Sequence, residues 1–393
     1  MKQCWRWFGP QDTVPLSHLH QVGVEGIVTA LHHIPPGIAW TAEEVNIRKR
    51  SLEDQALPWT VVESLVVSEE IKTQGPHMAE HLVAYKQSLA TLAAAGIETV
   101  CYNFMPILDW TRTDLRAPQP HGGTAMAFSL TDFAVFDLHI LKRPEAIGDY
   151  TDAQRAAAAE RFATMDDADR ANLRNNVVAG LPGANDGWTI EEVRDRLSTY
   201  DRVRPEQLRR HLIDFLSEIA PEAERLGIRL CCHPDDPPFP LLGLPRVMSS
   251  TSDYAHILDA VDLPSNGATL CTGSLGVAKE FNPAEFVTRL GSRIHFVHLR
   301  NTRRTGGEER RPDFFEAPHL EGDTDMVATI RALTAEENRR RAEGRRDWEI
   351  PMRPDHGQEL LSDLGGHSMP GYPLIGRMRG LAELRGIMAA CAG

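Results

Sequence analysis

RIHFVHLR, residues 293–300, is the most informative of the short apolar runs in this sequence. Successive side chains of a β-strand point to opposite faces, so Ile294, Phe296, His298 and Arg300 share one face. The face is apolar at its start and polar at its end. This pattern predicts a buried strand that carries His298 and Arg300 inward near its carboxyl end.

Seven further runs of similar length precede or follow this stretch, at intervals long enough for a helix. They are GIVTAL (26–31), WTVVES (59–64), TVCYNF (99–104), IRLCCHPDD (228–236), ATLCTGS (268–274), FFEAPHLEG (314–322) and IPMRPDHG (350–357). Helix starts between them are signalled by a capping box at 41–44 and by Asn282-Pro283 with an acid at position 285. Eight βα units without a dinucleotide-binding glycine fingerprint favour an α/β fold of the (β/α)8 TIM-barrel type over a doubly wound sheet.

The βα rhythm stops after the third of these strands and resumes only at residue 228. A gap this long exceeds an ordinary βα loop and predicts additional structure. Thr151 and Thr189, each followed three residues later by Gln or Glu, indicate helix starts. We therefore expect residues 1–393 to form a single (β/α)8 barrel domain, in which 105–200 is a long, mainly helical, lid-like insertion after the third strand.

Composition narrows the classes of partner. The formal net charge of −13 disfavours nucleic acid and anionic membranes, both of which reward clustered cations. We interpret the arginine-rich stretch at 300–311 as a solvated loop. No uncharged run is long enough for a membrane span, and the six cysteines lack disulfide-like spacing. The sequence thus predicts a cytoplasmic protein, with a homo-oligomer expected only from general frequency.

Active sites of (β/α)8 barrels lie at the carboxyl ends of the strands, and those ends are polar in this sequence. His233, Cys271, His298 and Asp355 would offer a mixed nitrogen, sulfur and oxygen shell to a divalent first-row metal. Each such residue by itself is more often structural, and only closure of the barrel would bring the four together. The remaining polar strand-end residues are His32, His33, Glu63, Asn103, Arg300, His319, Arg353 and His356.

Several longer segments resemble the mannonate dehydratases of hexuronate breakdown. The segments are WRWFGP (5–10), TALHHIP (29–35), CYNFMPILDWTRTDL (101–115), ILKRP (140–144), GLPGA (180–184), CHPDDPP (232–238), CTGS (271–274), HLR (298–300) and RPDHG (353–357). The resemblance covers essentially the whole chain in one order. It implies a barrel related to the xylose-isomerase-like group, with Mn(II) or Fe(II) held by His233, Cys271, His298 and Asp355. It also implies that His356, next to the metal-binding Asp355, and Tyr372 form the catalytic acid/base pair.

The activity implied by this resemblance is the dehydration of D-mannonate to 2-dehydro-3-deoxy-D-gluconate. Loss of the C2 proton beside a carboxylate is unfavourable unless a Lewis acid stabilises the developing charge. The sequence does not decide which member of the His356 and Tyr372 pair is the base. For substrate binding we expect His32, His33, Glu63, Asn103, Arg300 and Arg353, because arginines suit carboxylates, and amides and imidazoles suit hydroxyls. Two alternatives remain, a metal-dependent sugar isomerase or epimerase on the same barrel and a catalytically silent sugar-acid-binding protein.

Overall fold

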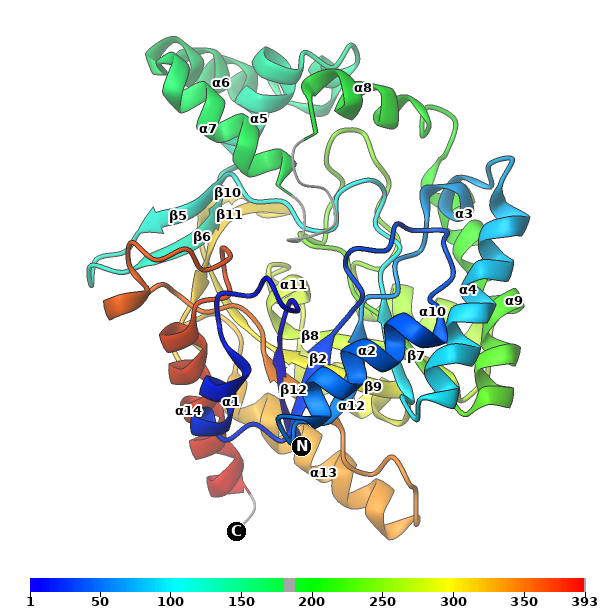
Figure 1. Ribbon diagram of the computed structural model, residues 1–393. Coiled ribbons are helices and arrows are strands. Elements are labelled where there is room, and N and C mark those ends of the chain that lie inside the picture. Colours follow the sequence, from blue (N-terminus) through cyan, green and yellow to red (C-terminus); the bar gives the residue numbers. More distant parts are fainter. Residues whose placement is uncertain (180–187, 392–393) are drawn as a thin grey trace.

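A closed barrel of eight parallel strands forms the centre of the computed structural model, which describes residues 1–179 and 188–391. The strands are paired in the order β1-β12-β9-β8-β7-β4-β3-β2 around the ring. Their bounds are β1 (Lys2–Arg6), β2 (Gly26–Thr29), β3 (Trp59–Glu63), β4 (Thr99–Tyr102), β7 (Arg229–Cys232), β8 (Asn266–Cys271), β9 (Ile294–Leu299) and β12 (Pro351–Pro354). The predicted α/β barrel is confirmed (Figure 1).

The prediction is wrong for one of the eight barrel strands, and one strand of the observed barrel was not predicted. The stretch 314–322 does not join the barrel, and its place is taken by β1, which pairs in parallel with both β2 and β12. The sequence of β1, KQCWR, is too short and too polar to stand out as a buried strand. The insertion predicted after the third strand therefore follows the fourth, β4.

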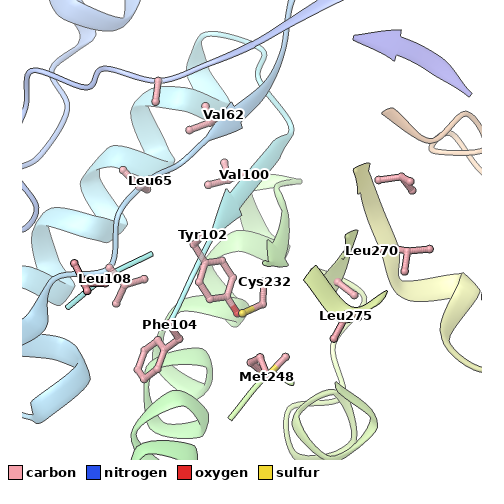
Figure 2. Packing of buried hydrophobic residues seen from close by; sticks show 14 of the residues in the cluster. Val62, Leu65, Val100, Tyr102, Phe104, Leu108, Cys232, Met248, Leu270 and Leu275 are labelled. Atoms are coloured by element: carbon pink, nitrogen blue, oxygen red, sulfur yellow. The ribbon is translucent and has the colours of Figure 1, made fainter. Parts of the chain in front are cut away.

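Helices surround the barrel and bury its outer face. These are α1 (Leu16–Val22), α2 (Ala42–Glu53), α3 (Glu69–Thr73), α4 (Met78–Ala94), α9 (Pro205–Leu226), α10 (Thr251–Ala260), α11 (Thr272–Gly276), α12 (Pro283–Leu290), η3 (Gly291–Arg293), α13 (Met326–Ala342), η4 (Leu361–Asp363) and α14 (Leu374–Cys391). Outward side chains of the strands pack against them in one large apolar core. Figure 2 shows the ring of Tyr102 beside Cys232 in this core, with Phe104 and Met248 nearby.

The segment at 105–200 combines helices with a hairpin that the sequence analysis did not predict. It contains β5 (Asp114–Pro118), β6 (Thr124–Phe128), α5 (Leu130–Val135), η1 (Phe136–Leu141), η2 (Ala146–Asp149), α6 (Asp152–Thr164), α7 (Asp167–Val178) and α8 (Ile190–Ser198). Capping boxes begin α6 and α8 at Thr151 and Thr189. The motif at 180–184 lies outside the described residues. Figure 1 shows α6, α7 and α8 beyond the end of the barrel opposite the start of β1, where the strands have their carboxyl ends.

A second, antiparallel sheet stands beside the barrel. Its strand order is β10-β11-β6-β5, with β10 at Asn301–Glu308 and β11 at Arg311–Ala317. The arginine-rich stretch is therefore a strand and a tight hairpin rather than the predicted loop, because β10 and β11 pair along their length. We call these four strands the side sheet. It joins the insertion to the segment that directly follows β9.

The barrel interior has two layers at successive inward positions of the strands. The lower layer is a separate apolar cluster composed of Cys4, Val28, Val61, Cys101, Cys231 and Phe296. Because inward positions repeat every second residue, the upper layer begins two residues further along each strand. Its members are Arg6, Glu63, Asn103, His233 and His298, together with Cys271 and Arg353, which are paired with His298 at the same height. Many polar residues of the predicted site thus belong to the upper layer.

Across both described ranges, no helix has the length and apolar character that crossing a bilayer requires.

Candidate metal centre and active site

Three of the four predicted metal ligands form a single cluster of potential donors. The ligand atoms of His233, Cys271 and His298 all lie within 4.8 Å of one another. Nε2 of His233 is 3.2 Å from Nδ1 of His298. The fourth predicted ligand completes the group, since Asp355 Oδ2 is 3.7 Å from the Cys271 sulfur and 3.8 Å from His298 Nδ1. Strands β7, β8 and β9 and the end of β12 bring the four residues together.

The donor set fits a divalent first-row metal. Donors that share one such ion at bonds of about 2.0–2.3 Å lie about 3–4 Å apart, as these atoms do. His298 faces this cluster with Nδ1, while its Nε2 lies 3.5 Å from Glu63 Oε1, a carboxylate placed to orient the ring. Two imidazoles, a thiol and a carboxylate are ligands that suit manganese, iron or zinc rather than magnesium. These residues therefore form the group that could hold a metal ion.

The Cys271 sulfur is oriented by the short helix that follows it. Ser274 Oγ lies 3.2 Å and Ser274 N 3.5 Å from the sulfur. Both groups can donate to a thiolate, and the backbone N–H belongs to the first turn of α11. The CTGS segment thus positions the sulfur and places two potential hydrogen-bond donors beside it.

Asp355 is held as a carboxylate by neighbouring cations. Burial alone would raise its pKa, but Arg353 and, more weakly, His356, His298 and Arg300 hold the pKa well below its usual value. Arg353 forms a short ion pair with one carboxylate oxygen, and Arg300 Nη1 lies 3.2 Å from the other. Asp355 is therefore ionised, the state that metal coordination requires.

The predicted acid/base pair lies directly beside this centre. The rings of His356 and Tyr372 meet edge to face, with centroids 5.1 Å apart. His356 Nε2 is 3.7 Å from Asp355 Oδ1. Burial raises the pKa of Tyr372 to about 12, with a further contribution from Asp355. The phenol is consequently protonated at neutral pH.

The turn that carries Tyr372 depends on a glycine. Gly371 has φ +78°, and a Cβ at this position would lie 2.5 Å from Met126 and 3.2 Å from the His356 ring. Its carbonyl accepts a hydrogen bond from the N–H of Gly357 at 2.9 Å. The turn is therefore fixed against the loop that carries His356, and larger side chains would separate the two rings.

Glu63 and Arg353 pair with each other where they line a small cavity beside the ligand cluster. Arg353 donates to both carboxylate oxygens of Glu63, at 2.9 and 2.7 Å, and Arg6 pairs with the same carboxylate at 2.5 Å. The pKa of Glu63 lies well below its usual value because these arginines outweigh the effect of burial. The three residues form a rigid ionic group at the floor of the site.

The other predicted substrate-binding residues are distributed over two adjoining cavities. Asn103 and Arg300 line a cavity of about 30 Å³ together with His233, Asp355, His356 and Tyr372. His32 lines a neighbouring cavity of about 310 Å³, and Ser64 and Asp109 line both. The ring nitrogens of His32 are buried without hydrogen-bond partners, and burial together with Arg6 and Arg48 lowers its pKa to about 3.

Two predicted strand-end histidines have other surroundings. His33 lines the larger cavity, but its side chain is 55% exposed and its Nε2 is 2.9 Å from Glu44. It is therefore not brought to the ligand cluster. His319 is buried, with Nε2 2.7 Å from the carbonyl of Leu299, a contact that ties the side sheet to the barrel.

Three buried charged residues close to His356 were not predicted from the sequence. Arg112 pairs with both Asp236 and Glu316, at 2.9 and 2.6 Å. Arg300 also contacts both carboxylates, at 2.9 and 3.2 Å. Asp236 and Arg112 lie within the recognisable segments CHPDDPP and CYNFMPILDWTRTDL, which was the available signal. Glu316 had no such signal, because its stretch was assigned to a barrel strand.

Comparison with known proteins identifies relatives that match this chain along its whole length. A model of the family described as D-mannonate dehydratase (UxuA) matches residues 1–392. The mannonate dehydratase of Rhizobium meliloti (strain 1021) is 55% identical over 391 residues, covering 99% of this chain and 97% of the relative. The mannonate dehydratase of Chromohalobacter salexigens is 48% identical over 390 residues, with coverage of 99% and 98%.

Solved structures agree with these sequence matches. The crystal structure of mannonate dehydratase from Streptococcus suis serotype 2 superposes with a TM-score of 0.77 at 30% identity, covering 100% of this chain and 93% of that chain. A xylose isomerase domain protein from Planctomyces limnophilus superposes with a TM-score of 0.51 at 10% identity, covering 99% and 96%. The second likeness shows a shared barrel fold.

Proposed function

The chain belongs to the D-mannonate dehydratase family and is a hydro-lyase, and from this premise we propose how its site removes water from D-mannonate. The product would be 2-dehydro-3-deoxy-D-gluconate. The observation that carries the proposal is the convergence of His233, Cys271, His298 and Asp355 beside His356 and Tyr372. Both groups come from segments by which the sequence resembles this family.

Mn(II) or Fe(II) is the proposed cofactor, with the four converging residues as its ligands. When bound, the ion would supply a Lewis acid for the negative charge that develops beside the substrate carboxylate. The Cys271 sulfur would bind as a thiolate, assisted by the two donors from Ser274. A thiolate ligand favours iron, manganese or zinc over magnesium, which supports the choice of a transition metal.

His356 and Tyr372 share the two proton transfers. A dehydration needs a base for the C2 proton and an acid for the departing C3 hydroxyl. We assign the acid to Tyr372, because its raised pKa keeps the phenol protonated. We assign the base to His356, whose Nε2 lies on the Asp355 side of the ring. Arg300 is the proposed partner of the substrate carboxylate, since it lines the smaller cavity beside both residues.

The two cavities would hold different parts of the six-carbon substrate, the carboxylate end in the smaller and the C4 to C6 end toward the larger. The smaller, of about 30 Å³, has room for only a few atoms next to the ligand cluster. We propose that the reacting carbons lie there and that the C4 to C6 hydroxyls extend toward the larger cavity, past Ser64 and Asp109. The unpaired ring nitrogens of His32 and the Asn103 oxygen are the proposed partners of these hydroxyls. His33 would contribute at most to the outer wall, and Glu63 and Arg353 would act by fixing the floor.

The insertion has a proposed role as a cover. Two residues of this region line the larger cavity. They are Trp188, just before α8, and Arg196, within α8. A wall of this kind would keep water from the charge that develops during the reaction. We further propose a cytoplasmic location, a possible homo-oligomer and no nucleic-acid partner. The unpaired state of the six cysteines and the net charge of −13 support these choices, and size-exclusion chromatography with light scattering would test the oligomer.

The experiment that tests this function is metal restoration followed by a product assay. Protein stripped with chelator should lose activity on D-mannonate and regain it with Mn(II) or Fe(II), yielding 2-dehydro-3-deoxy-D-gluconate. Tyr372→Phe should retain the metal and lower kcat by about 10²–10⁴-fold, the usual contribution of a general acid. Tyr254→Phe is the matched control, because Tyr254 is equally buried but donates to the carbonyl of Cys232 away from the cavity.

Two outcomes would contradict the proposal. Metal-loaded, folded protein that leaves D-mannonate unchanged but interconverts sugars would be an isomerase or epimerase. Protein that binds D-mannonate without turning it over would be a binding protein.

A further inference from the structure

Glu316 contacts His356, one member of the proposed catalytic pair, although it lies outside the barrel. It is on β11 of the side sheet and is 2% exposed. Its Oε1 atom is 3.2 Å from Nδ1 of His356. No barrel strand carries a carboxylate to this side of the His356 ring within the described residues, since Asp355 lies toward Nε2. The side sheet therefore delivers a group that faces the imidazole from behind.

Two buried arginines keep Glu316 ionised and fixed. Arg112 Nη2 is 2.6 Å and Arg112 Nε 3.2 Å from Oε1, while Arg300 Nε is 3.2 Å from Oε2. The pKa of Glu316 falls to about 2, because the arginines outweigh the effect of burial. An ionised carboxylate can only accept hydrogen bonds. The contact at 3.2 Å therefore requires the proton on Nδ1 of His356.

Arg300 is the more distant of the two charged neighbours of this nitrogen. Its Nη1 lies 3.4 Å from His356 Nδ1, but the same Nη1 is 3.2 Å from Asp355 Oδ2, an ionised acceptor. With Nδ1 protonated, neutral His356 presents Nε2 as its free lone pair. This is the tautomer that a base needs if the reacting proton is on the Asp355 side of the ring.

We propose that Glu316 is a positioning residue, which fixes the tautomer and the orientation of His356 and is itself held in place by Arg112. The inference rests on the proposed role of His356 in mannonate dehydration. It assigns a function to the side sheet: strand β11 supplies the carboxylate, and Arg112 comes from the segment between β4 and β5. A catalytic histidine at the end of one strand is thus supported by two segments outside the barrel.

The test starts from the metal-loaded, full-length enzyme with measured mannonate dehydratase activity, so that failure of the function itself is detected first. Glu316→Gln should lower kcat by about 10–100-fold, as loss of an orienting partner usually does. KM for D-mannonate and the bound metal should change less than about twofold, since Glu316 is not among the ligand atoms. Glu336→Gln is the matched control, a buried carboxylate paired with Arg340 at 2.8 Å beside the start of β9. It should retain normal kcat.

A double-mutant cycle separates positioning from general structural support. In a His356→Gln background, adding Glu316→Gln should lower kcat by less than about threefold, because the residue that Glu316 orients is already gone. An equal fold-loss in both backgrounds would overturn the proposal, as would unchanged kcat in Glu316→Gln or loss of metal from it. Glu316→Asp, which keeps the charge, should recover part of the activity. If Glu316→Gln fails to fold, Arg112→Lys provides the same cycle through the residue that holds Glu316.

Discussion

The two layers inside the barrel are separated by only two residues along each strand, yet they differ completely in chemistry. Cys231 belongs to the lower, apolar layer and His233 to the upper layer. The same step leads from Cys101 to Asn103 and from Phe296 to His298. The lower layer buries apolar groups and thiols, whereas the upper layer buries charges that are paired. The position of an inward-facing residue along its strand therefore decides whether it packs in the apolar layer or belongs to the candidate site.

The cysteines make this difference clearest. Cys231 contacts apolar residues, and its sulfur is 3.6 Å from the carbonyl of Val100. Cys101 in the same layer has a raised pKa, chiefly because of burial. Cys271 instead lies against Ser274, Asp355 and the two histidines. A thiol is therefore a small hydrophobic group in one layer and a candidate ligand in the other.

The largest expected effect comes from removing the upper-layer thiol. Cys271→Ala should lose the bound metal and lower kcat/KM by about 10³-fold or more, because several kcal/mol of Lewis-acid stabilisation disappear. Metal content measured by inductively coupled plasma spectrometry and the mannonate assay would check both changes. A variant that kept metal and activity would mean that the two layers do not differ in the way described.

Acid should destabilise the upper layer and the carboxylates next to it at a pH that leaves the lower layer unaffected. Glu63, Asp355 and Glu316 have pKa values below their usual range in the folded chain. Between about pH 4.5 and 2 the unfolded chain therefore binds more protons, so stability is full above this window and is lost as pH falls through it. Each proton taken up on unfolding lowers the free energy of unfolding by about 1.4 kcal/mol per pH unit.

Urea unfolding of chelator-treated protein, followed by circular dichroism between pH 3 and 7, measures this dependence. Cys4 of the lower layer does not titrate in that range, since burial raises its pKa to about 12. Glu316→Gln should show a weaker dependence than the unmodified protein. Equal stability at pH 3.5 and 6 would refute the assignment of Glu63, Asp355 and Glu316 as ionised carboxylates.

The smallest effect on activity is expected in the lower layer. Cys231→Ala should cost about 1–2 kcal/mol of stability, because it leaves a small cavity among tightly packed groups. Metal content and kcat should stay within about twofold, since the side chain is not among the candidate ligands. Loss of metal from this variant would show that the lower layer takes part in binding.

Sequence reasoning identified most of the barrel because alternation and apolar character are local properties. It could not separate FFEAPHLEG from a barrel strand, since a strand of an antiparallel side sheet has the same period. Strand β1 was missed for the opposite reason: its burial comes from pairing with β2 and β12, which lie far away in the sequence. His32 and His33 were both predicted for the site, but their different surroundings follow from facing different directions.

The candidate ligands were predictable because each lies at the end of a recognisable strand or within a long motif. Arg112 and Asp236 lie within such motifs, but their pairing joins positions 124 residues apart, and Glu316 acts through contacts 204 residues away with Arg112 and 40 residues away with His356. No local pattern marks a carboxylate that a side sheet brings to the back of a histidine.

Pairing of β1 with β12 also has a kinetic consequence. The ring closes through contacts such as Lys2 with Pro351, which join opposite ends of a 393-residue chain. Contacts of such sequence separation form late, because the loss of loop entropy precedes any gain. A nascent chain that has been synthesised only through β9 has three candidate ligands but lacks Asp355 and its neighbours His356 and Tyr372. Since Asp355 is the last of the four candidate ligands to be synthesised, the complete proposed site forms only after the chain has been made past β12.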